Sequence, residues 1–263
     1  VYEPYKRNRK VVADARTPKE KEEDEAFWEA FDELYEYLEK RSNCTMLQHQ
    51  QCEADDFIAR FIQNHPDHKH VIISSDSDFY QLINDNVSQY NGIMNQHITI
   101  DGVFDDKQKP VMDKKTGEQK QIGDPQYLLF EKCIRGDSSD NIFSAFPGAR
   151  KKGTKNKIGM LEAFADRDSK GFNWNNFMLQ RWTDHNGEEH RVLDDYHRNK
   201  TLIDLTAQPD DIKAVLDETI TNKVNTMPKG QIGLHFLRFC GKWDLQRLAD
   251  KASDHSKYLG ASY

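Results

Sequence analysis

The chain has 263 residues and a formal net charge of −7, so it can bury a substantial core in one large domain or two small ones. The acidic balance argues against a generic nucleic-acid coat, which would be basic overall, but not against an enzyme with local basic patches. No apolar run approaches the roughly 20 residues of a membrane span, and no secretory signal opens the chain. The four scattered cysteines form no CxxC pair, which favours a reduced, intracellular setting without a zinc cluster or disulfides.

A basic cluster stands at the start of the chain, where residues 5–10 read YKRNRK. A helix is predicted from Thr17 or Pro18, because both residues favour helix starts and acids crowd the first turns. Apolar side chains recur along it at helical spacing, and we interpret this face as core packing rather than as a platform for bases. They are Phe27, Phe31, Leu34, Tyr35 and Leu38.

A first group of acids opens the next predicted helix. Residues 45–47 suggest a short strand, and the helix begins at Ala54. Glu53, Asp55 and Asp56 stand at its start, where acids also complement the helix dipole. Three acids in four residues exceed what capping requires, and Glu53 and Asp56 share a face.

A second group of acids follows the apolar run Val71 to Ile73. The run predicts a strand that is buried on both faces of a parallel sheet. Asp76 and Asp78 come directly after it, and open α/β sheets bind their ligands beyond the carboxyl ends of the strands. Two such carboxylates repel each other unless a cation or a proton joins them. The alternative is a polar turn that caps the next helix.

A third group of acids, Asp137 and Asp140, follows a helix predicted over residues 127–134. The two acids are three residues apart, so on a helical turn they point the same way. Residues 87–123 are predicted to be β structure, with a tight hairpin turn at Asp101-Gly102. Helices predicted over 196–205, 212–220 and 232–239 make the last third of the chain mostly α.

A glycine-punctuated basic loop occupies residues 146–159, before an apolar helix. Glycine backbone, helix N-terminal amides and lysines suit a phosphodiester backbone, and a solvated basic loop is the equal alternative. His185 to His190 (HNGEEH) matches a zincin motif only in letters, since Asn-Gly predicts a turn that breaks the required helix. The loop histidines 65, 68 and 70 are interpreted as solvated rather than as metal ligands.

The three acid groups stand at comparable topological positions, and a doubly wound sheet would bring them to one rim. Converging carboxylates need divalent cations, and hard oxygen ligands point to Mg²⁺ or Mn²⁺. Two such ions roughly 4 Å apart would activate a water and neutralise the leaving oxygen of a phosphodiester. The basic clusters would then hold the strand that is cut.

The ordered motifs YKRNR, EADD, SSDSDF and GDSSDN, followed by FPG and the basic loop, resemble the 5′ nuclease (flap endonuclease) superfamily. The resemblance implies an α/β fold: a mostly parallel sheet flanked by helices (a PIN-like core), a helical arch and a mostly α C-terminal subdomain. It divides the chain into a nuclease core with the arch, residues 1–142, and a helical subdomain, residues 143–263.

The resemblance also implies the activity: a Mg²⁺- or Mn²⁺-dependent 5′→3′ exonuclease, flap endonuclease and ribonuclease H that uses two ions per site. It would act in DNA replication in a phage-infected bacterial cell, on 5′ flap DNA, RNA–DNA hybrids and nicked or gapped duplex, not at a membrane. Implied partners are a sliding clamp and a single-stranded-DNA-binding protein.

Residue roles follow from the motifs that match the family. The implied metal ligands are Glu53, Asp55, Asp56, Asp76, Asp78, Asp137 and Asp140. The implied catalytic contacts to the scissile phosphate are Lys6 and Arg9. The basic residues expected to bind DNA are Arg7, Lys10, Arg150, Lys151, Lys152, Lys155 and Lys157. Residues 143–160 take the place of a duplex-gripping helix–turn–helix that uses K⁺ in some relatives, and the inserted ARKKGTKNK argues against K⁺ here.

The sequence departs from the family upstream of YKRNR. Relatives carry a buried strand with an Asp and a further Asp before the arch, and this chain shows neither. We therefore expect an incomplete first metal site in this chain by itself. The alternative function is a non-catalytic DNA-binding fragment or subunit that needs a second polypeptide, such as an N-terminal fragment of the same enzyme, to complete the metal site.

Overall fold

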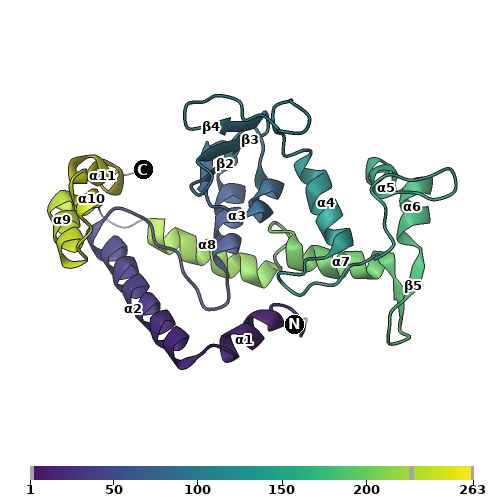
Figure 1. The fold of residues 1–263 in the computed structure, drawn as a ribbon, viewed down its shortest axis with the longest axis horizontal. Helices are drawn as coiled ribbons and strands as arrows, with labels where there is room; N and C mark the ends of the chain where they lie inside the picture. The colour runs from purple at the N-terminus through teal and green to yellow at the C-terminus, as the bar shows by residue number, and fades with distance from the viewer. Residues whose placement is uncertain (1–2, 225–227, 262–263) are drawn as a thin grey trace. The chain divides into compact units, whose positions relative to one another are not determined.

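The computed structural model describes residues 3–224 and 228–261 (Figure 1). The chain divides into two compact units, one formed by Val1–Val11 and Ile58–Pro209 and the other by Val12–Phe57 and Asp210–Tyr263. Helices α1 (Arg7–Asp14) and α3 (Ala54–Asn64) each run across this division. The functional boundary expected at residue 142 stays a prediction.

The first unit contains a sheet with strand order β1-β2-β3-β4. Its strands are β1 (His70–Ile73), β2 (Val87–Asn91), β3 (Gln96–Thr99) and β4 (Gly102–Asp105). The expected α/β class is confirmed. The sheet is mixed, because β1 and β2 pair in parallel whereas β2–β3 and β3–β4 are antiparallel. A tight turn joins β3 to β4 as predicted, but it lies at Ile100 and Asp101, one residue before the predicted Asp101-Gly102 position. Gly102 pairs with Thr99 as the first residue of β4 and adopts a φ of +130°.

The prediction that residues 71–73 are buried on both faces is wrong. Ile72 is 5% exposed and packs in a cluster with Phe79 and Val87, but Val71 is 60% and Ile73 79% exposed. Successive side chains of a strand point to opposite faces of the sheet, so Val71 and Ile73 share the face opposite to that of Ile72, and this face is open to solvent in the described structure. Residues 45–47, which suggested another strand, form no regular structure.

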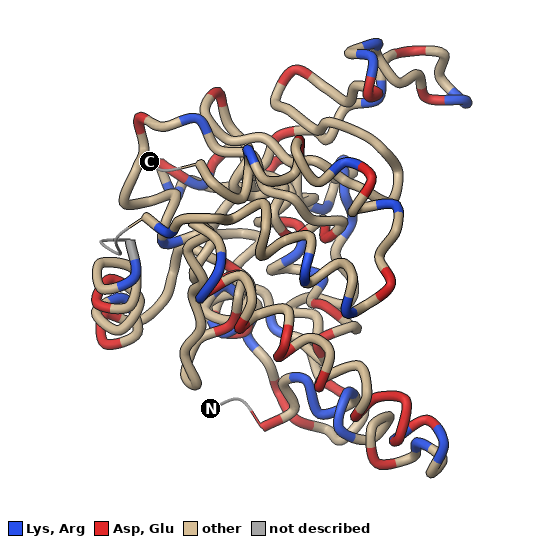
Figure 2. The backbone as a smooth tube through the Cα atoms, turned by 90° about the vertical axis from the view of Figure 1, so that its left-hand side faces the viewer, with Lys and Arg blue, Asp and Glu red and all other residues tan. Residues whose placement is uncertain are grey.

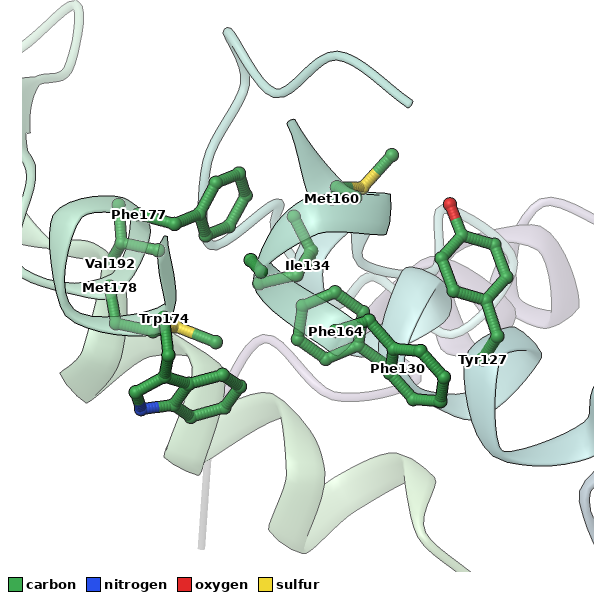
Figure 3. Close-up of a cluster of buried hydrophobic side chains, with 10 residues drawn as sticks. Tyr127, Phe130, Ile134, Met160, Phe164, Trp174, Phe177, Met178 and Val192 are labelled. Carbon is green, nitrogen blue, oxygen red and sulfur yellow. The ribbon is translucent and has the colours of Figure 1, made fainter. Parts of the chain in front are cut away.

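The main core of this unit lies among its helices (Figure 3). Helix α4 (Pro125–Arg135) packs against α7 (Val192–Ile203), and α5 (Met160–Ala165) packs against α6 (Phe172–Met178). The helices predicted over 127–134 and 196–205 are thereby confirmed, although α4 is longer at both ends and α7 begins and ends earlier than predicted. The buried side chains are Tyr127, Phe130, Ile134, Met160, Ala163, Phe164, Trp174, Phe177, Met178 and Val192.

A two-stranded hairpin joins α6 to α7. It consists of β5 (Arg181–Thr183) and the antiparallel β6 (Glu189–Arg191), so residues 185–190 lie on a turn and a strand, as the Asn-Gly pair predicted. The indole Nε1 of Trp182 donates to the carbonyl oxygen of Ala145 at 2.9 Å. This bond ties the hairpin to the segment that follows the third acid group.

The second unit is helical. It contains α2 (Pro18–Arg41), α8 (Asp210–Val224), α9 (Ile232–Lys242), α10 (Gln246–Ala249) and α11 (Ala252–Leu259). Helix α2 starts at a capping box in which Thr17 and Glu20 satisfy each other's backbone N–H groups. Its C-terminal part buries Tyr37 in a cluster with Phe236 and Cys240. Among the described residues, no helix has the length and apolarity that crossing a membrane demands.

The expected core face of α2 is mostly open. Phe27 is 59% and Phe31 43% exposed, and Leu34 is also exposed. The periodicity predicted the helix correctly, but the apolar packing of α2 against α9 within this unit runs through Tyr37 and Leu38, near the C-terminal end of the helix. The interpretation of Phe27, Phe31 and Leu34 as core residues is therefore wrong.

The buried and exposed phenylalanines of α6 provide a test of the core. Phe177 is fully buried, whereas Phe172 on the same helix is 76% exposed. We expect Phe177→Ala to lower the free energy of unfolding by about 3–5 kcal/mol, because it leaves a cavity in the core. Phe172→Ala should change it by less than about 0.5 kcal/mol. Urea unfolding measures both, and equal losses would show that this cluster is not the core of the unit.

Candidate active site

The third acid group lies on a closed loop at the end of α4. Gly136 ends the helix with a φ of +75°, and a Cβ there would lie 2.4 Å from the carbonyl oxygen of Ile142, so glycine is required. Asp137 and Ile142 then exchange backbone hydrogen bonds of 2.9 and 2.7 Å. The loop is thereby fixed, and it presents Asp137 and Asp140 in one defined arrangement.

Lys132 joins the second and third acid groups. Its ammonium contacts the carboxylate of Asp78, and it lies 2.7 Å from Oδ2 of Asp137. The side chain of Asp137 is 12% exposed and those of Lys132 and Asp78 are 26% and 29% exposed, so the contact is only partly screened by water. Two carboxylates separated by 59 residues in the sequence are thus held together by one cation.

The ionisation of this cluster follows from its contacts. Burial raises the pKa of Asp137, but hydrogen bonds from Lys132 and from Ser139 outweigh it and bring the pKa to about 2. Burial likewise lowers the pKa of Lys132, but its hydrogen bonds to Asp137 and Asp78 leave that pKa raised. The ammonium and the Asp137 carboxylate are therefore both charged across the neutral range.

Asp76 acts as the cap of the short helix η1 (Ser77–Leu82), which was one of its two predicted roles. Its Oδ1 accepts the backbone N–H of Asp78 at 2.9 Å. The fully buried Gln89 on β2 donates to the carbonyl oxygens of Ser74 and Asp76, at 2.7 and 2.8 Å. The turn that carries Asp76 and Asp78 is therefore anchored to the neighbouring strand.

The N-terminal basic segment docks on the third acid group. The guanidinium of Arg9 pairs with the carboxylate of Asp140, and the backbone N–H of Lys6 donates to the carbonyl oxygen of Asp140 at 2.8 Å. Asn8 donates to the carbonyl oxygen of Ser139 at 3.0 Å, and Asn141 donates to that of Pro4 at 2.6 Å. Two motifs that are about 130 residues apart in the sequence thus meet.

The first acid group, Glu53, Asp55 and Asp56, belongs to the second compact unit. All three stand at or before the first turn of α3, as predicted. The backbone N–H of Glu53 donates to Oδ2 of Asp56 at 2.9 Å, so Asp56 takes part in the local capping of this helix.

The basic loop is folded tightly onto the start of α5. The backbone N–H groups of Gly153 and Gly159 each donate to the carboxylate of Glu162 at 3.0 Å. These two glycine amides are therefore engaged by Glu162 in this structure. The basic side chains of the loop are all exposed, namely Arg150, Lys151, Lys152, Lys155 and Lys157, and so are Arg7 and Lys10 on α1. Basic and acidic positions are interspersed along the backbone (Figure 2).

Lys132 was not singled out in the sequence. The available signal was a lysine in the last turn of the helix that leads to GDSSDN. Asn199 was missed as well, and it is fully buried on α7. Its side-chain amide donates to the carbonyl oxygens of Cys133 and Phe143, at 2.9 and 2.8 Å, and so fixes both ends of the third acid loop.

The donor set suits a hard divalent cation, because carboxylate oxygens are the ligands that Mg²⁺ and Mn²⁺ prefer. In the described part of the chain, no three of the acids predicted as metal ligands have ligand atoms that all lie within 4.8 Å of one another. The cation that joins Asp78 to Asp137 in this structure is Lys132. The residues fit a cation site in charge and donor type.

Comparisons with known proteins show which family model and which solved structures this chain is similar to. Residues 1–115 match the family model described as the 5′-3′ exonuclease N-terminal resolvase-like domain. A bacteriophage T5 protein co-crystallised with metal ions has a similar fold, with a TM-score of 0.58, 20% identity and coverage of 85% of this chain and 78% of that one.

Two further T5 structures share the fold at 20% identity. One is the T5 5′-exonuclease with bound divalent zinc, with a TM-score of 0.57 over 84% of this chain and 78% of that one. The other is a bacteriophage T5 flap endonuclease in a pseudo-enzyme–product complex with DNA and metal ions, with a TM-score of 0.56 over 84% and 77%. The α/β fold of this chain is therefore that of solved 5′ nucleases.

The Lys132 cluster predicts a defined pH dependence. Asp137 has an ordinary pKa of 3.8 and a folded pKa of about 2. Its stabilising contribution, about 2 kcal/mol, is complete above the unfolded pKa and is lost as the pH falls towards the folded one. Lys132→Met should lower the free energy of unfolding by about that amount at pH 7, because the carboxylates then lack their cation.

The difference between wild type and Lys132→Met should shrink as the pH approaches 2, as measured by urea unfolding across the acid range. Arg135→Met is the control, since Arg135 is exposed on the same helix and pairs with the nearby Glu131. A constant difference between wild type and Lys132→Met at all pH values would rule out the charge-based explanation.

Proposed function

We propose that this protein is a Mg²⁺-dependent, structure-specific 5′ nuclease that acts in DNA replication. Its substrates would be 5′ flaps, RNA–DNA hybrids and nicked or gapped duplex. The observation that carries the proposal is the gathering of Asp78, Asp137 and Asp140 with Lys132 and Arg9, residues from four separate segments. The family match over residues 1–115 and the fold shared with 5′ nucleases support it.

The carboxylates of the second and third groups would hold the divalent ions, together with Glu53, Asp55 and Asp56. When bound, two such ions supply an activated water and stabilise the leaving oxygen of a phosphodiester. The protein's own groups prepare this site. Lys132 keeps Asp78 and Asp137 close together, and the low pKa of Asp137 keeps its carboxylate ionised and ready to bind a cation.

The N-terminal basic residues would contact the scissile phosphate. Arg9 is 60% exposed while it pairs with Asp140, so its guanidinium can reach a second anion beside the acids. Lys6 is tied to the same loop through its backbone N–H. A phosphate placed between these cations and the acidic cluster would have its charge offset during the reaction.

The exposed basic loop would grip the duplex. Its glycine amides are engaged by Glu162, so binding relies on side-chain charge from Arg150, Lys151 and their neighbours. Contacts of this kind position a nucleic acid without reading its sequence. Arg7 and Lys10, exposed on α1, would extend the basic surface.

Ribonuclease H activity on RNA primers is the finer part of the proposal. It rests on the resemblance of residues 73–76 (ISSD) and 196–204 (YHRNKTLID) to the ribonuclease H of T-even phages. By the same resemblance, the partners would be a sliding clamp and a single-stranded-DNA-binding protein.

A second candidate function is a DNA-binding subunit that needs another polypeptide for catalysis. One observation favours it: the edge strand β1 exposes Val71 and Ile73, close in sequence to Asp76 and Asp78. Apolar side chains beside unpaired backbone groups are suited to accept a further strand. Such a strand would lie next to the second acid group and would bring its own side chains to that site.

Cleavage of a labelled 5′ flap tests the nuclease proposal. We expect Asp76→Asn with Asp78→Asn to reduce Mg²⁺-dependent cleavage by about 100-fold or more, the scale of losing charge stabilisation at a reacting centre. Flap binding, measured by fluorescence anisotropy, should persist. The control is Asp67→Asn with Asp85→Asn, two exposed acids in the same unit.

The same assay separates the two candidates. A wild-type chain that binds the flap without cutting it, and that cuts once an N-terminal polypeptide is added, supports the second one. Equal losses of binding and cleavage in the Asp76/Asp78 double variant would show that these acids serve folding instead of catalysis.

Salt dependence tests the role of the basic loop. Lys151→Ala with Lys152→Ala should weaken duplex binding and reduce the slope of log K against log salt by about 2. The reason is that binding releases fewer counterions from the DNA for each lysine–phosphate contact that is lost. Lys107→Ala with Lys109→Ala, in an exposed turn after β4, is the matched control. An unchanged slope in the first variant would remove the loop from the interface.

A further inference from the structure

The conformation of the turn in the β5–β6 hairpin is fixed by the carboxylate of Asp184. Oδ1 of Asp184 accepts the backbone N–H groups of Asn186 and Glu188, at 2.9 and 2.8 Å. The hydrogen bond from the Glu188 N–H is the main reason that the pKa of Asp184 is lowered, so this side chain is an anion at neutral pH. The second oxygen, Oδ2, faces the imidazole of His190 at 3.9 Å from Nε2.

Three side chains of different types converge at this turn. A carboxylate oxygen of Asp184, one of Glu188 and a ring nitrogen of His190 all lie within 4.8 Å of one another. Asp184 and Glu188 flank the turn, and His190 stands on β6 opposite Trp182 of β5. Strand pairing and the turn therefore place a mixed set of oxygen and nitrogen ligands on one side of the hairpin.

The imidazole of His190 is held in a fixed orientation. Its ring stacks on Trp182 with a centroid distance of 4.5 Å and an interplanar angle of 16°. Its Nδ1 lies 3.1 Å from Oδ2 of Asp195, which is 8% exposed and also accepts a bond of 2.6 Å from Arg198. An ionised carboxylate only accepts hydrogen bonds, so Nδ1 carries the proton and donates to Asp195.

In the neutral ring, Nε2 then has an unprotonated lone pair on the side of Asp184. A carboxylate that accepts from one imidazole nitrogen while the other faces further ligands is the arrangement that orients metal-binding histidines. It fixes the tautomer and raises the basicity of the ligand nitrogen. This orientation comes from Asp195 on α7, outside the cluster, and so is independent of the convergence at the turn.

We propose that the β5–β6 hairpin binds a divalent transition-metal ion, with Zn²⁺ as the best fit, through Asp184, Glu188 and His190. Asp195 acts as a positioning residue. An imidazole together with two carboxylates favours Zn²⁺ over Mg²⁺, which takes oxygen ligands and keeps much of its water. The site is separate from the acids proposed for the nuclease, and the inference does not rest on that function.

A metal at this position would stabilise the segment behind the third acid group. Trp182 donates to the carbonyl oxygen of Ala145, and Arg198, the partner of Asp195, donates to that of Phe143 at 3.3 Å. These two hydrogen bonds therefore connect the hairpin and its histidine partner Asp195 to the residues that follow Asp140. Binding of an ion to the folded hairpin stabilises the folded state by mass action.

Zn²⁺ titration by calorimetry tests the site, on the whole chain and with Mg²⁺ in large excess to fill oxygen-only sites. Glu188→Gln and His190→Gln should abolish the Zn²⁺ binding that the wild type shows under these conditions. Glu189→Gln and His185→Gln are the matched controls, because each is a residue of the same type in the same hairpin that lies outside the ligand set. Both controls should bind Zn²⁺ as the wild type does.

Glu188 is exposed, so Glu188→Gln should keep the fold even if His190→Gln does not. Zn²⁺ should raise the melting temperature of the wild type and leave that of Glu188→Gln unchanged. Failure of the wild type to bind Zn²⁺ in excess Mg²⁺, or equal losses in the controls, would overturn the proposal. Flap cleavage in Mg²⁺ should be unaffected by Glu188→Gln, so this site and the nuclease proposal fail independently.

Asp195→Asn tests the positioning role. It should weaken Zn²⁺ affinity by about 10–100-fold, the usual effect of losing the hydrogen-bond partner of a ligand histidine. Nitrogen NMR of the His190 ring should show that Zn²⁺ shifts the Nε2 resonance in the wild type. Unchanged affinity in Asp195→Asn, or a Zn²⁺-induced shift at Nδ1 in the wild type, would contradict the assigned geometry.

Discussion

The ammonium of Lys132, placed between the carboxylates of Asp78 and Asp137, is the interaction on which the candidate active site depends. It joins a helix, the turn after β1 and the loop after α4, which would otherwise bring like charges together. The position of Lys132 is set by α4, which is anchored in the core through Phe130 and Ile134. The geometry of the acids is therefore a consequence of helix packing, although the acids themselves lie in loops.

Each acid of this site has a local partner that holds it in place. Ser139 and Lys132 hold Asp137, Arg9 holds Asp140, and the η1 backbone holds Asp76. These contacts neutralise or orient carboxylates that the proposed chemistry would share among metal ions. A net charge of −7 is thus compatible with DNA binding, because acids are gathered and internally compensated while basic side chains of the 150–157 loop point to solvent.

The β5–β6 hairpin and the loop that carries Asp137 and Asp140 are connected by hydrogen bonds to the same segment, residues 143–145. Asn199 and Arg198 on α7 hold the carbonyl oxygen of Phe143, and Trp182 holds that of Ala145. Asp195, one turn before Arg198, orients His190 at the same time. A metal ion at the hairpin would therefore act on the proposed active site through packed elements, at a place where no carboxylate of the nuclease set lies.

Local patterns in the sequence were sufficient for the start of the helix at Pro18, the helix predicted over 127–134, the existence of the tight turn after β3 and the break in HNGEEH, because caps, turn residues and periodicity act within a few residues. The carboxylate groups were also recognisable from their positions after strands and before helices. Periodicity shows which side chains share a face, but not what covers that face, and so Val71, Ile73, Phe27 and Phe31 were wrongly expected to be buried.

Only the tertiary structure decided which distant residues meet. It placed Lys132 between two acid groups, Arg9 against Asp140, and His190 beside Asp184 and Asp195. Each of these contacts depends on the packing of separate elements, which is set by the shape and burial of whole faces and leaves no local signature in the sequence. The sequence by itself determines which chemical groups the chain carries, and the fold determines which of these groups contact one another.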